Sequence, residues 1–122
     1  MICKFANNQQ VEYIDAIETE EFYAGASRRT LTFYCPSDAI SIDILNSILS
    51  NEENCMTITL TNPDEGITNI YEYYVLKLKV GIESVLVEPA TPDRPAVYED
   101  ELVFKLGRRT YIEQSLHDLG IN

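Results

Sequence analysis

The chain has 122 residues, of which 45% are hydrophobic and 24% are charged, and its 20 acidic and 9 basic side chains give a formal net charge of −11. Such a composition excludes a disordered chain and is typical of one folded domain with a core of its own. An excess of acids this large also argues against binding to nucleic acid, unless the bases gather on one face. We therefore expect a single α+β domain over residues 1–122.

Alternating apolar and polar residues predict that much of the chain is β-strand. The segment Val11 to Ile17 predicts a strand whose buried face the pattern leaves open. Leu31, Phe33 and Cys35 then alternate with polar residues and predict a half-buried strand directly after a pair of arginines.

A helix follows these strands. Ser41 is a favourable N-cap residue, and Ile42, Leu45 and Leu49 recur at helical spacing. The polar run Ser50 to Asn54 predicts the end of this helix.

Three further strand segments follow the helix. Alternation over Met56 to Leu60 predicts a strand, and the Pro-Asp-Glu-Gly sequence that follows it predicts a turn. The segment Ile70 to Val80 predicts one long strand, in which Gly81 marks a bulge or bend before Ile82 to Val87. The predicted outward face of the long strand comprises Tyr71, Tyr73, Lys77 and Lys79.

Beyond a proline-bearing loop over residues 88–95, Leu102, Phe104 and Leu106 predict a strand with Val103 and Lys105 facing outward. The whole pattern predicts an α+β fold: a mainly antiparallel β-sheet or a partly closed barrel, with one internal helix and one C-terminal helix.

The C-terminal helix has the clearest local signals. Thr110 and Glu113 have the spacing of a capping box, and Gly120 can stop the helix in a left-handed conformation. An apolar stripe at helical spacing indicates that the helix docks on the domain. The stripe comprises Ile112, Leu116 and Leu119.

Residue chemistry gives little sign of catalysis. Cys3, Cys35 and Cys55 are far apart and form no Cys-x-x-Cys pair, so we expect reduced, buried thiols in a cytoplasmic protein. His117 is the only histidine, and its place in the last turn of a helix favours a helix-dipole role. With no phosphate-binding glycine loop and no metal-ligand spacing, we expect neither an enzyme nor a cofactor or metal site.

Two identical Arg-Arg-Thr triplets, at residues 28–30 and 108–110, hold four of the nine bases. Dibasic pairs of this kind are more typical of ion pairs at strand ends than of a phosphate site. The acidic pairs are interpreted as solvated surface, since catalytic carboxylates need defined separations and burial.

Three segments, Glu21 to Phe33, Ser41 to Leu49 and Leu106 to Glu113, together resemble small tail-module proteins, of the tail-tube or baseplate type, from phages and prophages of Gram-positive gut bacteria. The resemblance covers most of the chain in order and pattern. It implies a non-enzymatic virion component that is made in the host cytoplasm and enters the tail. Its partners would be itself and other tail proteins, in a homo-oligomeric assembly, with no nucleic acid and no membrane.

Tyrosine is well suited to protein interfaces, because it is large, rigid and polar at its tip. We therefore expect the partner surface near Tyr71, Tyr73, Lys77 and Lys79, although cross-strand packing explains these tyrosines equally well. The alternative function is an acidic inhibitor that mimics DNA and blocks a nucleic-acid-binding enzyme.

Overall fold

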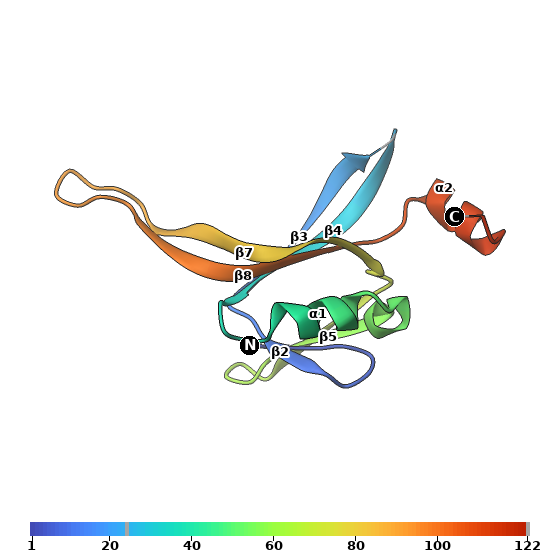
Figure 1. Cartoon of the computed structure of the whole chain (residues 1–122), viewed down its shortest axis with the longest axis horizontal. Coiled ribbons are helices and arrows are strands. Elements are labelled where there is room, and N and C mark those ends of the chain that lie inside the picture. The colour runs from blue at the N-terminus through green and yellow to red at the C-terminus, as the bar shows by residue number, and fades with distance from the viewer. Residues whose placement is uncertain (24, 122) are drawn as a thin grey trace.

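The computed structural model describes residues 1–23 and 25–121, and it confirms an α+β fold (Figure 1). The described residues form eight strands, two α-helices and a short 3-10 helix, η1. In chain order these are β1 (Ile2–Lys4), β2 (Gln10–Glu12), β3 (Asp15–Tyr23), β4 (Ala26–Pro36), α1 (Ile42–Leu49), η1 (Glu52–Cys55), β5 (Thr57–Asn62), β6 (Ile67–Glu72), β7 (Leu76–Glu88), β8 (Val97–Gly107) and α2 (Tyr111–Asp118).

The strands form two open antiparallel sheets rather than the partly closed barrel that was the alternative expectation. One sheet has the order β2-β1-β5-β6 and the other has the order β3-β4-β8-β7. Each sheet has four strands, and β4 and β8 lie at the centre of the second sheet.

The core lies where the two sheets and α1 meet. Phe33 of β4 stacks on Phe104 of β8 with ring centroids 4.5 Å apart, and Tyr13 meets Phe33 edge to face. Leu45, Ile48 and Leu49 bury one side of α1, as its spacing predicts, whereas Ile42 is exposed. The alternations of β4, β5 and β8 are confirmed where they face this core. The buried residues concerned are Leu31, Phe33, Cys35, Ile58, Leu60, Leu102, Phe104 and Leu106.

Several elements project from this body (Figure 1). The β7–β8 hairpin extends far beyond the body at one end of the long axis, and α2 stands at the opposite end. The β3–β4 hairpin rises between them. We call residues 82–100, the distal part of the β7–β8 hairpin, the arm.

Two predicted strands are each divided between the sheets. The segment Val11 to Ile17 contributes to β2 and to β3, and the segment Ile70 to Val80 contributes to β6 and to β7. The second break lies at Tyr73, which has a φ of 65°, followed by the buried Tyr74. Alternation continues across these breaks, so the pattern alone does not show that the chain changes sheets.

The bulge expected at Gly81 is wrong, and Val103 lies on the outward face that the sequence predicts but is buried there. The irregularities of β7 fall between Lys77 and Lys79 and between Leu86 and Glu88, while Gly81 pairs in register with Val103. Val103 is buried although it faces away from the core. It shares a hollow with the longer side chains of Lys79 and other neighbours, which shield it from water.

The three cysteines are free and buried, as expected. Burial raises the pKa of the Cys35 and Cys55 thiols to about 12, and it raises that of Cys3 as well. Within residues 1–23 and 25–121, no group of three or more His, Cys, Asp or Glu residues could hold a metal ion.

Candidate interaction site

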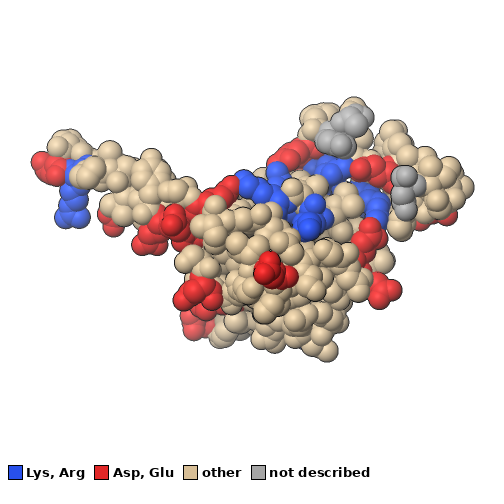
Figure 2. All heavy atoms as spheres, viewed as in Figure 1, with Lys and Arg blue, Asp and Glu red and all other residues tan. Residues whose placement is uncertain are grey.

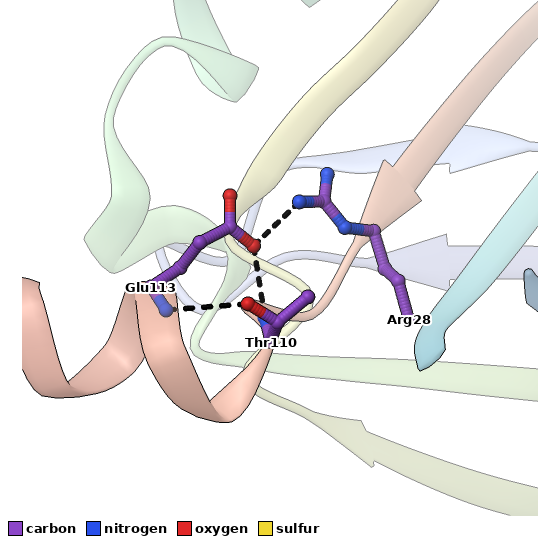
Figure 3. Close-up of polar contacts among 3 residues, drawn as sticks. All are labelled: Arg28, Thr110 and Glu113. Carbon is purple, nitrogen blue, oxygen red and sulfur yellow. Dashed lines mark hydrogen bonds and ion pairs between the residues drawn. The ribbon is translucent and has the colours of Figure 1, made fainter. Parts of the chain in front are cut away.

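The start of α2 is fixed by a polar cluster of Arg28, Thr110 and Glu113, which we call the root of α2 (Figure 3). The capping box is confirmed: Glu113 N donates to Thr110 Oγ1 at 3.2 Å, and Thr110 N donates to Glu113 Oε1 at 2.9 Å. The same Oε1 accepts from Nη2 of the buried Arg28 at 2.5 Å, so one carboxylate joins β4 to α2. Desolvation acts to raise the pKa of Glu113, but the hydrogen bonds from Thr110 and Arg28 outweigh it and the net pKa is lowered.

The second arginine triplet extends this root. Arg109 forms an ion pair with Glu52 of η1, and Arg108 N donates to the carbonyl of Arg29 at 2.9 Å. Arg29 itself pairs with Glu20 across the β3–β4 hairpin. The two Arg-Arg-Thr triplets therefore lie side by side, and the ion-pair interpretation of their arginines is confirmed for Arg28, Arg29 and Arg109.

Beyond this root, α2 is not docked, so the expectation of a packed C-terminal helix is wrong. None of its residues is buried, and the sides that are partly covered carry Glu113 and His117. Leu116 is 41% exposed and Ile112 is 47% exposed. Gly120 has the expected left-handed φ, and Ile121 N closes the last turn on the Leu116 carbonyl at 2.8 Å. The helix is well formed, but its apolar stripe faces solvent.

Beside α2 lies a groove made of two adjoining pockets, of about 520 and 510 Å³, that share Tyr73 and Arg108. The first also contains Arg29, the acidic residues Glu18 and Glu72 and the end of β6, and the second contains Tyr111 of α2. We call this surface the arginine–tyrosine groove and define it by Arg29, Tyr73, Arg108, Arg109 and Tyr111. Guanidinium groups beside aromatic rings are suited to bind carboxylates and apolar side chains together.

Tyr73 and Tyr74 line this groove, and each is held by a hydrogen bond. Tyr73 is 53% exposed in a backbone conformation that side chains rarely adopt, and its N–H donates to the Met56 carbonyl at 3.0 Å. Tyr74 is buried, and its hydroxyl donates to Glu18. Burial and this hydrogen bond raise the pKa of Tyr74, while Arg29 and Arg108 oppose the rise because their charges lie nearby.

Charge is unevenly distributed over the molecule. Figure 2 shows Lys and Arg gathered over the middle, beside the base of the β3–β4 hairpin, while Asp and Glu predominate along the arm. The arm carries Glu83, Glu88, Asp93, Glu99 and Asp100 against the single base Arg94. The acidic molecule thus has a basic region next to the groove.

The structure does not unite the four residues proposed from sequence as one interface. Tyr73 lies in the groove, but Tyr71 is partly buried on β6 and meets Tyr74 edge to face. Lys77 and Lys79 lie on β7, in the other sheet. Lys77 donates to Asn46 of α1 at 3.3 Å, and Lys79 pairs with Glu83.

Sequence reasoning missed the groove, although a signal was present. The repeated triplets marked two strand ends, and antiparallel pairing of β4 with β8 brings them together. For the arm, the sequence predicts a strand over Ile82 to Val87 and a loop over residues 88–95, but it does not predict that the large apolar residues of the arm are exposed. They comprise Ile82, Leu86, Val87, Val97 and Tyr98.

No protein-family profile, curated protein or solved structure matches this chain. Among the described residues, no helix has the length and apolar character needed to cross a membrane.

Proposed function

We propose that this chain is a non-enzymatic structural protein that acts by self-association or by docking on neighbouring proteins. The specific role is that of a phage or prophage tail component, as the resemblance of its segments implies. The observation that carries the proposal is the exposure of large apolar side chains on the arm and on α2, the two elements that project farthest along the long axis.

Exposed apolar surface of this kind supports an assembly role. Scattered apolar residues are normal on a protein surface, but contiguous patches on a soluble protein mark interaction sites. A two-stranded ribbon is marginally stable in water without a packed face, so the arm gains order when another surface covers it. The same holds for α2, which spans only eight residues.

The DNA-mimic alternative rests on the net charge of −11 and on the carboxylates of the arm. A mimic needs carboxylates spread over one surface in place of phosphates. The bases gathered beside the groove interrupt such a surface on the face seen in Figure 2. The structural role therefore accounts for more of the molecule.

Sedimentation velocity over a range of protein and salt concentrations separates the two functions. A structural component should show mass that rises reversibly with protein concentration. A chain that stays monomeric throughout, and that binds a basic nuclease or polymerase tightly at low salt and weakly at high salt, would instead be a mimic.

A further inference from the structure

We infer that the arm of one copy docks on α2 and the arginine–tyrosine groove of a second copy, so that copies join head to tail. This inference rests on the proposed assembly function and names the two surfaces that meet. The partner of each unpaired surface is thus another molecule of the same chain.

The sheet face that packs on the core within the body continues into the arm. Alternate residues of a strand share one face, so Tyr98 and Asp100 of β8 lie on the side that buries Leu102 and Phe104. Ile82 and Leu86 of β7 pair in register with Leu102 and Tyr98 and share that side. Leu102 is fully buried, but Ile82, Leu86 and Tyr98 are 46%, 50% and 59% exposed. The apolar face continues where the body no longer covers it.

The α2 helix presents the complementary feature. Its polar Glu113 side faces the body and binds Arg28, while Ile112 and Leu116 of the apolar stripe remain 47% and 41% exposed. The stripe continues through Leu119 at the C-cap. An amphipathic helix held by its polar side has its apolar side available for a partner.

These two faces cannot meet within one molecule. The arm and α2 lie at opposite ends of the long axis, with the two-sheet body between them (Figure 1). Contact between them therefore requires two copies, and the resulting dimer would retain one free arm on one copy and one free α2 on the other. Such a heterologous contact continues into a ring if the rotation closes and into a filament if it does not.

Charge favours this pairing over contacts between like surfaces. The apolar face of the arm includes the exposed carboxylate of Asp100, and the rest of the arm is acidic. The groove beside α2 has the exposed Arg108, which makes no ion pair with any residue that the structure describes. Two arms would repel each other, whereas the arm can pair its Asp100 carboxylate with Arg108 of the groove.

Mixing two defective chains tests this arrangement. Leu86→Glu places a charge on the arm and Leu116→Glu places one on α2, both at exposed sites where the fold should tolerate it. Ile67→Glu, at a similarly exposed residue of β6, is the matched control. Far-UV circular dichroism checks that each variant is folded, and sedimentation velocity measures its association.

We expect Leu86→Glu and Leu116→Glu each to associate about tenfold or more weakly than wild type, and Ile67→Glu to behave as wild type. An equimolar mixture of the two defective chains retains one intact interface, so it should form dimers and stop there. A mixture that stays monomeric while wild type associates would overturn the head-to-tail contact and leave the assembly function standing. Wild type that is monomeric at every concentration would overturn both.

Discussion

Glu113 combines two roles at the start of α2, because one carboxylate closes the capping box and binds Arg28. The capping box alone would fix only the first turn of the helix. The contact with Arg28 ties the first turn to β4 of the body (Figure 3). Among the contacts near the start of α2, the Arg28–Glu113 pair reaches into the helix itself, since Arg108 and Arg109 precede its first residue.

The lowered pKa of Glu113 gives this attachment a pH dependence. A carboxyl group with a folded-state pKa below its usual 4.5 contributes stability above that value, and the contribution disappears as the pH falls through the folded-state pKa. We expect amide protection in α2 to decrease below about pH 4.5 while the sheet core remains protected. Amide hydrogen exchange by NMR measures both regions in the same sample.

Glu113→Gln is the matched control for this effect, since glutamine can still close a capping box but carries no charge. Its α2 should be less protected than that of wild type at neutral pH and should respond less to acid. Identical acid profiles for α2 in the two proteins would contradict the role assigned to the Arg28–Glu113 pair.

The buried cysteines should be chemically inert in the folded protein. The thiolate is the reactive form, and with a pKa of about 12 only about one in ten thousand Cys35 or Cys55 thiols is ionised at pH 8. We expect a chromogenic disulfide reagent to find no rapidly reacting thiol in native protein and three after denaturation. A stoichiometric thiol reaction within minutes in native buffer would contradict the burial of these side chains.

At the scale of elements, the sequence predicts strands well where one face meets the core. The alternations in β4, β5 and β8 are of this kind. The capping box of α2 is equally predictable, because it depends only on residues three positions apart. The division of one predicted strand into β6 and β7 is not predictable, since the same alternation continues through Tyr73.

The position of α2 shows a further limit of the sequence. An apolar stripe indicates that something covers a helix, but it does not say whether the cover belongs to the same chain. The groove is not predictable from the sequence either. Its residues Tyr73, Arg29 and Arg108 come from distant segments, which only the pairing of the strands brings together.

The undocked helix leads to a stability prediction. Leu116→Ala removes an exposed side chain, so we expect it to change the free energy of unfolding by less than about 0.5 kcal/mol. Leu106→Ala, in the core, should cost about 2–5 kcal/mol. Chemical denaturation at low protein concentration measures both values, and a loss of several kcal/mol in Leu116→Ala would mean that α2 packs on its own domain.

At the scale of the whole molecule, two electrostatic effects act on association: copies repel each other through their net charge, and the arm of one copy is attracted to Arg108 of another. Copies with a net charge of −11 repel, and salt screens that repulsion over about 8 Å at physiological ionic strength. We expect wild-type association to strengthen as salt rises from low to physiological concentration. Arg108→Glu should associate more weakly than wild type at every salt concentration, with a difference that narrows as salt increases. Sedimentation velocity over a salt series checks this, and wild-type association that weakens steeply with salt would contradict it.

Disulfide trapping tests the contact between the arm and α2 most directly. One chain carries Leu86→Cys, the other carries Leu116→Cys, and the native cysteines are buried. Under mild oxidation the mixture should form a cross-linked dimer, which a non-reducing gel detects. It should form this dimer much faster than either chain alone, and much faster than a control mixture of Ile67→Cys with Leu116→Cys. If the Leu86→Cys and Leu116→Cys chains cross-linked no faster than the control mixture, the arm of one copy would not lie on α2 of the next.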